Sequence, residues 1–203
     1  MASVACNIVL LPEPDLAQKS IAASQLLAQS HDTHFVLEDG EYYPHATLYM
    51  VQLKTEDLPR AQDLLASIAT HTAPLTLQVD QYMQAEGYID ANYVRTPEAD
   101  AVHWAVVHAI NPIRDGMREK NKQRMAQATG LTRENFEMYG DHRVGDLFRP
   151  HITLTRLGKA QPIDASILPP PSAFNGTFTR LGLFEMGDNG TCVHKVAEFP
   201  FAA

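Results

Sequence analysis

A chain of 203 residues, 45% of them hydrophobic and 20% charged, suits one globular domain with a sizeable core and does not resemble a disordered or low-complexity protein. Its 16 basic and 24 acidic side chains leave a formal net charge of −8, which argues against binding long duplex nucleic acid through the overall field. Two cysteines do not make a disulfide framework, and no apolar stretch is long enough to cross a bilayer.

The first half of the chain predicts strands that alternate with helices. Its opening apolar run ends at Pro12 and has no basic segment before it, so we interpret it as a buried strand rather than a signal peptide and expect a cytoplasmic protein. Thr55 or Asp57 can cap a later helix. The predicted elements are a strand over 4–12, a helix over 14–30, strands over 33–40 and 45–53, and a helix over 55–70.

The second half predicts two hairpins around a central helix. Thr96, Pro97 and Glu98 supply a capping hydroxyl, a proline and an acid, which together are typical of a helix start, and Pro112 should kink that helix. The predicted elements are a hairpin of 74–83 with 88–94, the helix from 97, a polar segment over 118–145, a strand over 151–157, and a hairpin of 174–186 with 191–199. Because strands outnumber helices and several pairs are antiparallel, the fold class is α+β.

The chain contains the pentapeptide Pro-His-x-Thr-Leu twice, at 44–48 and at 150–154. Each copy falls on a predicted strand, where successive side chains point to opposite faces. His45 and Thr47 therefore share one face, as do His151 and Thr153. The intervening apolar residues can enter a core. Extending the same alternation places four more side chains beside the two pairs, namely Tyr43 and Tyr49 beside the first and Arg149 and Thr155 beside the second.

A cleft faced by both strands would suit acid–base chemistry on a phosphodiester. One imidazole can take a proton while the other gives one near neutral pH. Threonine hydroxyls are short and restricted at χ1, so they can hold the non-bridging oxygens of a phosphate in place. Threonine is not a usual zinc ligand and no acidic or thiol side chain accompanies either histidine at ligand spacing, so we expect neither a metal nor another cofactor.

The paired motif resembles the 2H phosphoesterase superfamily, which is named for two His-x-Thr motifs. The second copy, FRPHITLTR over 148–156, is similar to the branch of bacterial RNA 2′,5′-ligases and cyclic phosphodiesterases. The resemblance covers most of the chain. It implies a single bilobal domain over 1–203, with two antiparallel-rich sheets, flanking helices and pseudo-twofold symmetry around a central cleft.

The resemblance also implies roles for individual residues. His45 and His151 are the expected catalytic pair, with His151 as base and His45 as acid, and Thr47 and Thr153 bind the phosphate. The implied reaction opens a 2′,3′-cyclic phosphate on a nucleotide or RNA end. A 2′,5′-ligase-like activity and a nucleotide-binding module without turnover remain alternatives. The expected partner is a nucleotide or short RNA with a cyclic phosphate or a 2′,5′ linkage, with no membrane, and we expect a monomer.

Other polar side chains carry weaker indications. His31 and His34 could pair on a metal, although a solvated loop is the simpler interpretation, and we interpret His103 and His108 as surface residues. His142 belongs to a loop that either covers the cleft or is plain surface. Tyr43, Tyr49 and Tyr139 are candidates for base stacking. Arg156 matches the sequence pattern of the ligase and cyclic phosphodiesterase branch, yet strand alternation places it on the face away from His151. The run of Arg118, Lys120, Lys122 and Arg124 either steers RNA or is a solvated helix end.

Overall fold

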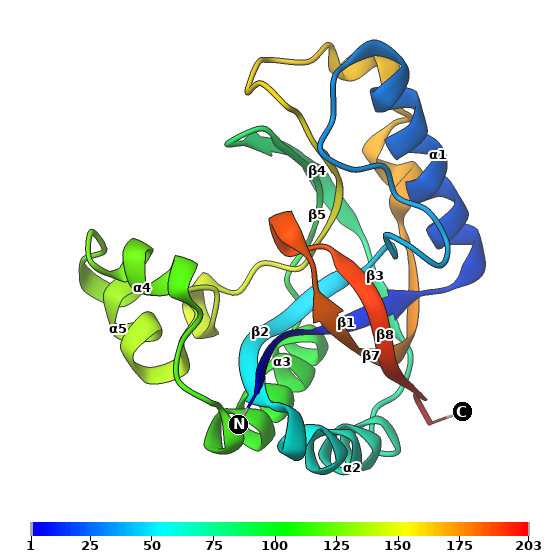
Figure 1. Ribbon diagram of the computed structural model, residues 1–203. Helices are drawn as coiled ribbons and strands as arrows, with labels where there is room; N and C mark the ends of the chain where they lie inside the picture. Colours follow the sequence, from blue (N-terminus) through cyan, green and yellow to red (C-terminus); the bar gives the residue numbers. More distant parts are fainter. Residues whose placement is uncertain (1, 203) are drawn as a thin grey trace.

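The computed structural model describes residues 2–202, and in it an eight-stranded antiparallel sheet is flanked by helices (Figure 1). The α+β class predicted from the sequence is confirmed. The strands are β1 (Ser3–Pro12), β2 (Ala46–Lys54), β3 (Leu75–Leu77), β4 (Val79–Ala85), β5 (Tyr88–Tyr93), β6 (His151–Arg156), β7 (Gly176–Met186) and β8 (Cys192–Pro200). The helices are α1 (Pro14–Ser30), α2 (Leu58–Ala69), α3 (Pro97–Ile110), α4 (Glu119–Met125) and α5 (Gly130–Tyr139).

The two halves of the sheet meet at the two repeated motifs. The strand order is β3-β7-β1-β2-β6-β5-β4, with β8 added on β7. Strands β2 and β6 pair antiparallel through Ala46 and Ile152 alone, the central residues of the two motifs. This pair joins the two expected sheets into one. It also places the two motifs side by side in opposite directions.

Helices cover the two halves separately. Helices α2 and α3 pack on each other and against β2, β7 and β8, while α1 packs against β6. Helices α4 and α5 pack on each other and stand to one side of the sheet (Figure 1). The core fills with the apolar faces of the strands, including Ala46, Leu48, Ile152 and Leu154, all at most 1% exposed. None of the helices within residues 2–202 is both long and apolar enough to span a membrane.

Several predicted elements differ in the structure. The strand expected over 33–40 is absent, and the segment makes only isolated bridges. The strand expected over 74–83 divides at Gln78 into β3, which pairs with β7, and β4, which pairs with β5. Helix α3 is capped by the Thr96 hydroxyl as predicted but ends at Ile110, before Pro112, so no kink forms. The polar segment over 118–145 contains α4 and α5, which bury few apolar side chains and therefore give little indication of a helix.

Both motif strands contain a β-bulge at the same place. Thr47 pairs with Val9 and Tyr49 with Ile8, so Leu48 is an extra residue in β2. In β6 the same irregularity makes Leu154 the extra residue. Two residues then oppose one on the neighbouring strand, and the alternation of side chains resets beyond the bulge. The leucine of each pentapeptide therefore changes which later residues face the core.

Candidate active site

A cavity of about 450 Å³ lies where the two motifs meet. It is lined by His45, Thr47, His151, Thr153 and Arg149, so the structure brings these five sequence-predicted side chains together. Further lining comes from β5, from α4 and α5, from the segment 141–143 before β6, and from the turn 189–191 before β8. The cavity is thus enclosed by segments that are far apart along the chain.

The two imidazoles are tethered in the same way. His45 Nδ1 lies 2.7 Å from the carbonyl oxygen of Tyr43, and His151 Nδ1 lies 2.7 Å from the carbonyl oxygen of Arg149. A carbonyl oxygen can only accept, so each Nδ1 carries the proton and donates. Each Nε2 is then the nitrogen that can take up or release a proton. Both rings are preset in the tautomer that general acid–base chemistry requires.

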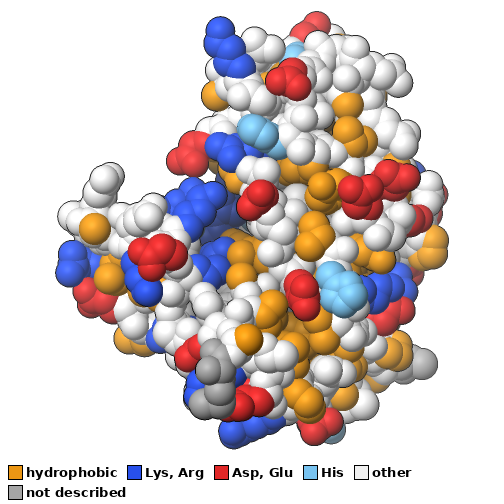
Figure 2. Space-filling view, viewed as in Figure 1, with side chains coloured by type: hydrophobic (Ala, Val, Ile, Leu, Met, Phe, Trp, Pro, Cys, Tyr) orange, Lys and Arg blue, Asp and Glu red, His pale blue; other side chains and the backbone are white. Residues whose placement is uncertain are grey.

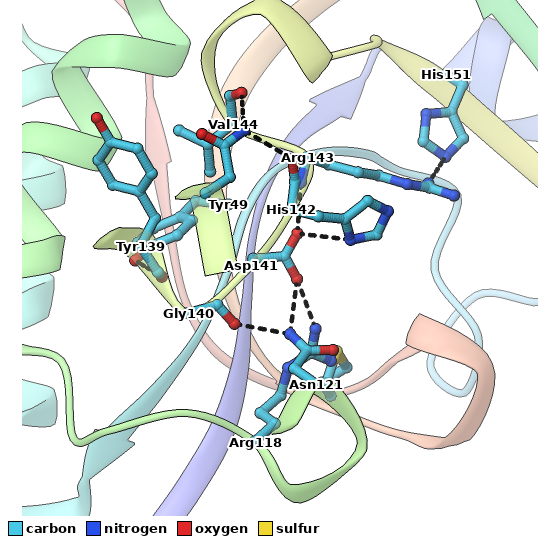
Figure 3. A network of polar contacts seen from close by, with 12 residues as sticks. Tyr49, Arg118, Asn121, Tyr139, Gly140, Asp141, His142, Arg143, Val144 and His151 are labelled. Atoms are coloured by element: carbon cyan, nitrogen blue, oxygen red, sulfur yellow. Dashed lines mark hydrogen bonds and ion pairs between the residues drawn. The ribbon is translucent and has the colours of Figure 1, made fainter. Parts of the chain in front are cut away.

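Arg143 contacts the free ring nitrogen of His151. Its guanidinium donates to His151 Nε2 at 3.1 Å, as Figure 3 shows. The pKa of His151 is lowered, first by burial, against which the Asp90 carboxylate acts, and then by the Arg143 cation. The imidazole of His151 is therefore held neutral, with its lone pair directed at a cation.

The ring of His45 has a different environment. Its Nε2 lies 3.3 Å from the Asn7 side-chain nitrogen, and Asn7 also donates to the carbonyl oxygen of Gly190 at 3.2 Å. Burial lowers the pKa of His45 to about 4, while the carbonyl groups of Tyr43 and Gly190 favour the protonated ring and act in the opposite direction. Nearby His151 lowers the pKa further. His45 is therefore also neutral in the free protein, but the carbonyl oxygen of Gly190 can accept a hydrogen bond from Nε2 when the ring is protonated.

Asp90 organises the polar groups around the second motif. Its carboxylate accepts from the Thr153 hydroxyl at 2.8 Å and from the Arg149 guanidinium at 2.9 Å. Asp90 is only 3% exposed, and it lies opposite Thr153 in the register of β5 with β6. Because a buried carboxylate is stable as an anion only when it is paired, this contact orients Thr153 and Arg149 together.

The bulges overturn two of the predicted positions. Tyr49, expected beside His45, is 1% exposed, and its hydroxyl donates to Asn111 and to the carbonyl oxygen of Tyr139. Thr155, expected beside His151, is fully buried and donates to the carbonyl oxygen of Phe35. The alternation counted from the histidines fails because each extra leucine turns the following residue into the core.

The residues that follow Tyr49 and Thr155 point away from the core. Met50 lines the cavity in the first copy. Arg156, expected on the far face in the second copy, donates to Asn189 at 2.6 Å and lies over the ring of Tyr88 at 4.8 Å. Asn189 and Tyr88 both line the cavity. The expectation that Arg156 faces away from the site is therefore wrong.

Two other tyrosines expected to bind a base are outside the cavity lining. The ring of Tyr43 packs against Phe184 at 5.0 Å and lies under the Lys195 ammonium group at 5.2 Å. Tyr139 packs edge-on against Trp104, with 6.0 Å between the ring centroids, and is absent from the cavity lining. Base stacking by Tyr43, Tyr49 or Tyr139 thus has no support in their positions.

Two of the remaining histidines, His103 and His142, are placed differently from what the sequence suggested, whereas His108 is exposed as expected. His103 is fully buried, where its Nδ1 donates to the carbonyl oxygen of Leu48 and its Nε2 accepts from the Gly145 amide. His142 lines the cavity and is not plain surface. Within residues 2–202, His31 and His34 belong to no group of three or more potential metal-ligating side chains.

The loop that carries Arg143 is fixed by a buried network (Figure 3). The Asp141 carboxylate, 2% exposed, accepts from Arg118 at 2.7 Å, from Asn121 at 3.1 Å and from the Arg143 amide at 2.9 Å. Asn135 donates to the carbonyl oxygens on either side of Arg143. This network ties α4 and α5 to the loop and so sets the position of the Arg143 guanidinium.

Sequence reasoning missed Asn7, Asp90, Arg143 and Asn189. Two of these had a recognisable indication, because Asn7 interrupts an apolar strand and Asp90 stands inside the β5 strand, and an isolated polar residue in such a place needs a partner. Arg143 and Asn189 lie in loops, where polar side chains are common. Only the folded chain shows that these two reach the cavity.

No protein-family model matches the chain, and neither does any curated protein sequence. Solved structures match it over its whole length. E. coli LigT in complex with phosphate is 15% identical, with 100% of both chains covered and a TM-score of 0.56. A structure described as a phosphoesterase is 13% identical, with 100% of both chains covered and a TM-score of 0.58.

TT0787 of Thermus thermophilus is 15% identical, with 97% of each chain covered and a TM-score of 0.57. The chain therefore shares the fold of these structures, and the α+β fold that the resemblance implied is confirmed. At these identities the likeness is one of fold.

Proposed function

We propose that the chain is a metal-independent phosphodiesterase that opens 2′,3′-cyclic phosphates on nucleotides or RNA ends by two-histidine acid–base catalysis. The observation that carries the proposal is the symmetry of the site: two His-x-Thr pairs line one cavity, and both rings are tethered through Nδ1 so that Nε2 is the reactive nitrogen. These groups supply both proton transfers and the anion contacts that in-line attack on a phosphodiester requires.

In the proposed reaction His151 is the base and His45 the acid. His151 Nε2 removes a proton from a water molecule as the water oxygen forms a bond to phosphorus. The bond from phosphorus to the 2′ or 3′ oxygen breaks on the opposite side, and that oxygen receives the Nε2 proton of His45. His151 gains one proton and His45 loses one, so the net charge of the pair is unchanged. Before the next turnover His151 must release its proton and His45 must take one up.

The surroundings of the two rings favour these roles. The Arg143 cation opposes protonation of His151, which keeps the base unprotonated. The Gly190 carbonyl favours a proton on His45. A phosphodiester anion between the rings adds a negative charge, which raises the pKa of His45 from its free value of about 4 and allows this ring to carry the acid proton.

The other side chains of the cavity hold the anion. The Thr47 hydroxyl lines the cavity and can donate to a non-bridging oxygen, and Arg143 and Arg149 supply positive charge beside His151. The Thr153 hydroxyl donates to Asp90 in the free protein, so it contacts a non-bridging oxygen only once its proton turns from Asp90 to the phosphate. Asp90 balances Arg149 and fixes the Thr153 hydroxyl. The LigT structures solved with phosphate and with 3′-AMP support a phosphate or nucleotide as the occupant of such a cavity.

The test is hydrolysis of the four 2′,3′-cyclic nucleotides and of a short RNA with a cyclic phosphate end, in the presence of EDTA. We expect ring opening to a nucleoside monophosphate. Phosphorus NMR monitors the reaction and distinguishes the 2′ and 3′ products. Absence of turnover on every substrate, by a protein whose melt is normal, would falsify the enzymatic proposal. Joining of RNA ends without hydrolysis would instead favour ligase-like chemistry.

A further inference from the structure

Helix α4 and the residue before it add a second group of cations to the cavity. Arg118, Lys120 and Arg124 line it, in addition to Arg143 and Arg149 beside His151. Figure 2 shows Lys and Arg side chains gathered around a hollow between the part of the molecule that carries α4 and α5 and the sheet. The acid–base steps of the proposed function use none of these α4 side chains.

The helix divides the basic run into two faces. Lys120 and Arg124 are four residues apart and so share a face, which is the face that lines the cavity. Lys122 is absent from the lining and instead pairs with Glu119 at 3.1 Å, on the exposed side. If the run were only a solvated helix end, all of its cations would face solvent. Instead, Lys120 and Arg124 line the cavity and Lys122 does not.

The cavity-facing cations are incompletely neutralised. Within residues 2–202 Lys120 makes no ion pair, and the nearest carboxylate of Arg124 is Glu86, 3.8 Å away and largely exposed. Arg118 pairs with Asp141 through one nitrogen, while its buried Nε has no partner and another nitrogen faces only the Met186 sulfur. Cations that line a cavity without a close protein carboxylate are typical of an anion site.

Like charges also converge there from separate elements. The pKa of Lys120 is lowered, first by partial burial and then by the cations of Arg124, Arg156 and Arg118, against which the Asp188 carboxylate acts. Arg156 comes from β6 and is bound only to neutral groups, the Asn189 side chain among them. Bringing these cations together costs free energy in the empty protein, and that cost is relieved when an anion binds between them.

The size of the cavity fits more than one phosphate. Its volume of about 450 Å³ lies within the range of about 300–1,000 Å³ usual for small-molecule sites, and the His-x-Thr motifs occupy only one part of its wall. A nucleotide with its reacting phosphate between His45 and His151 would leave the α4 cations free for another group.

We propose that Lys120 and Arg124, with Arg118 beside them, form a second phosphate site, so that the substrate is a nucleotide with a phosphate group in addition to the one that reacts. This inference rests on the proposed function, because it takes the first phosphate to lie between the histidines. The second phosphate is attached to the 5′ oxygen of the same nucleotide, either as a terminal monoester or as the internucleotide diester of an RNA chain, and both present anionic non-bridging oxygens.

Binding measurements test the site without relying on turnover. Calorimetry compares adenosine 3′-monophosphate, adenosine 3′,5′-bisphosphate and the dinucleotide ApAp on the full chain. We expect at least one ligand with two phosphates to bind about tenfold tighter than the monophosphate. Lys120→Gln and Arg124→Gln should each bring that ratio towards one. Lys122→Gln, on the same helix but outside the cavity, is the matched control and should keep it.

The outcomes separate the two proposals. Tighter binding of the bisphosphate alone assigns the site to a 5′-phosphate, and tighter binding of ApAp alone assigns it to an RNA chain. Equal affinities for all three ligands overturn the second site, as does a ratio that falls as much in Lys122→Gln as in Lys120→Gln, since that is a general field effect. If a ligand with two phosphates binds tighter than the monophosphate but no cyclic phosphate is opened, the second phosphate site is supported and the enzymatic proposal is overturned. Failure to bind any of the three overturns both.

Discussion

His45 and His151 hold their rings through the same contact: in each, Nδ1 donates at 2.7 Å to the carbonyl oxygen of the residue two positions earlier, Tyr43 or Arg149. Each histidine is followed by a threonine that lines the same cavity and by a leucine that forms a bulge. The repeat in the sequence is thus a repeat in local geometry. It leaves the same ring nitrogen, Nε2, unprotonated in both histidines, and the surroundings of the two Nε2 atoms differ.

Replacing either histidine should remove most turnover. We expect His45→Ala and His151→Ala each to lower kcat on a 2′,3′-cyclic nucleotide by about 10²–10⁴-fold, because each removes one proton transfer. The double variant should be little worse than either single one, since the pair acts as a unit. Steady-state kinetics measure this, and His194→Ala on an exposed strand position is the matched control. Full activity in either single variant with a normal melt contradicts the mechanism.

The threonine hydroxyls should matter less. Thr47→Ala and Thr153→Ala each remove one hydrogen bond to a charged oxygen, worth about 1.5–3 kcal/mol, so kcat/KM should fall about 10- to 150-fold. Thr47→Ser and Thr153→Ser keep a hydroxyl and should recover most of the loss. For Thr153 the hydrogen bond lost in the free protein is the one to the Asp90 carboxylate, so Thr153→Ala should also disturb the Arg149 guanidinium that Asp90 holds. Serine variants as poor as the alanine variants would show that the methyl group, not the hydroxyl, is what the site uses.

Removal of the Arg143 cation should shift one limb of the pH profile. Arg143 lowers the pKa of His151, so Arg143→Gln should raise that pKa. A base must be unprotonated, so the acidic limb of kcat/KM should move to higher pH and activity at low pH should fall. Kinetics from about pH 4 to about pH 9 on both proteins measure the shift. Movement of the alkaline limb instead would assign the acid role to His151.

Chelation should leave activity unchanged. The proposed proton transfers use imidazoles, and the charge on the phosphate is met by Thr, Arg and Lys side chains, so no step needs a metal ion. The measurement is turnover after dialysis against EDTA, with the untreated protein as control. Loss of activity that Mn²⁺ or Zn²⁺ restores contradicts this mechanism.

The buried ring of His103 should make stability depend on pH. Burial lowers its pKa to about 4, below the ordinary value of 6.5. Between about pH 6.5 and about pH 4 His103 is protonated in the unfolded chain but not in the folded protein. The free energy of unfolding therefore decreases as the pH falls through this range. His103→Phe keeps a ring against Phe148 but leaves Leu48 O and Gly145 N unpaired, at a cost of about 1–3 kcal/mol for each group.

Urea denaturation at about pH 7 and about pH 5 measures both effects. The wild-type protein should lose more stability between these values than His103→Phe does. His108→Phe, at an exposed position on the same helix, should keep the wild-type dependence. An equal loss in wild-type and His103→Phe proteins would assign the pH dependence to other groups, His45 and His151 first among them.

Local sequence patterns predicted most of the regular elements. An apolar run ending at Pro12, the Thr96-Pro97 helix start and the final hairpin are all present, because each depends on neighbours along the chain. The segment over 33–40 failed as a strand since a strand needs a partner, and the fold offers only single bridges at Thr33 and Glu38. Helices α4 and α5 were missed because their apolar faces are small and they pack largely on each other.

The repeated pentapeptide was sufficient to predict that His45, Thr47, His151 and Thr153 face one cavity, because alternation along a strand is a local property. Tertiary structure decided everything beyond the bulges. The extra leucine in each strand is recognisable only from its pairing with β1 or β5, and it sends Tyr49 into the core and Arg156 towards the cavity. The contacts of Arg143 with His151, of Asp90 with Thr153 and of Asn7 with His45 join residues from different elements. Such contacts depend on how the elements pack, which no local pattern of side chains contains.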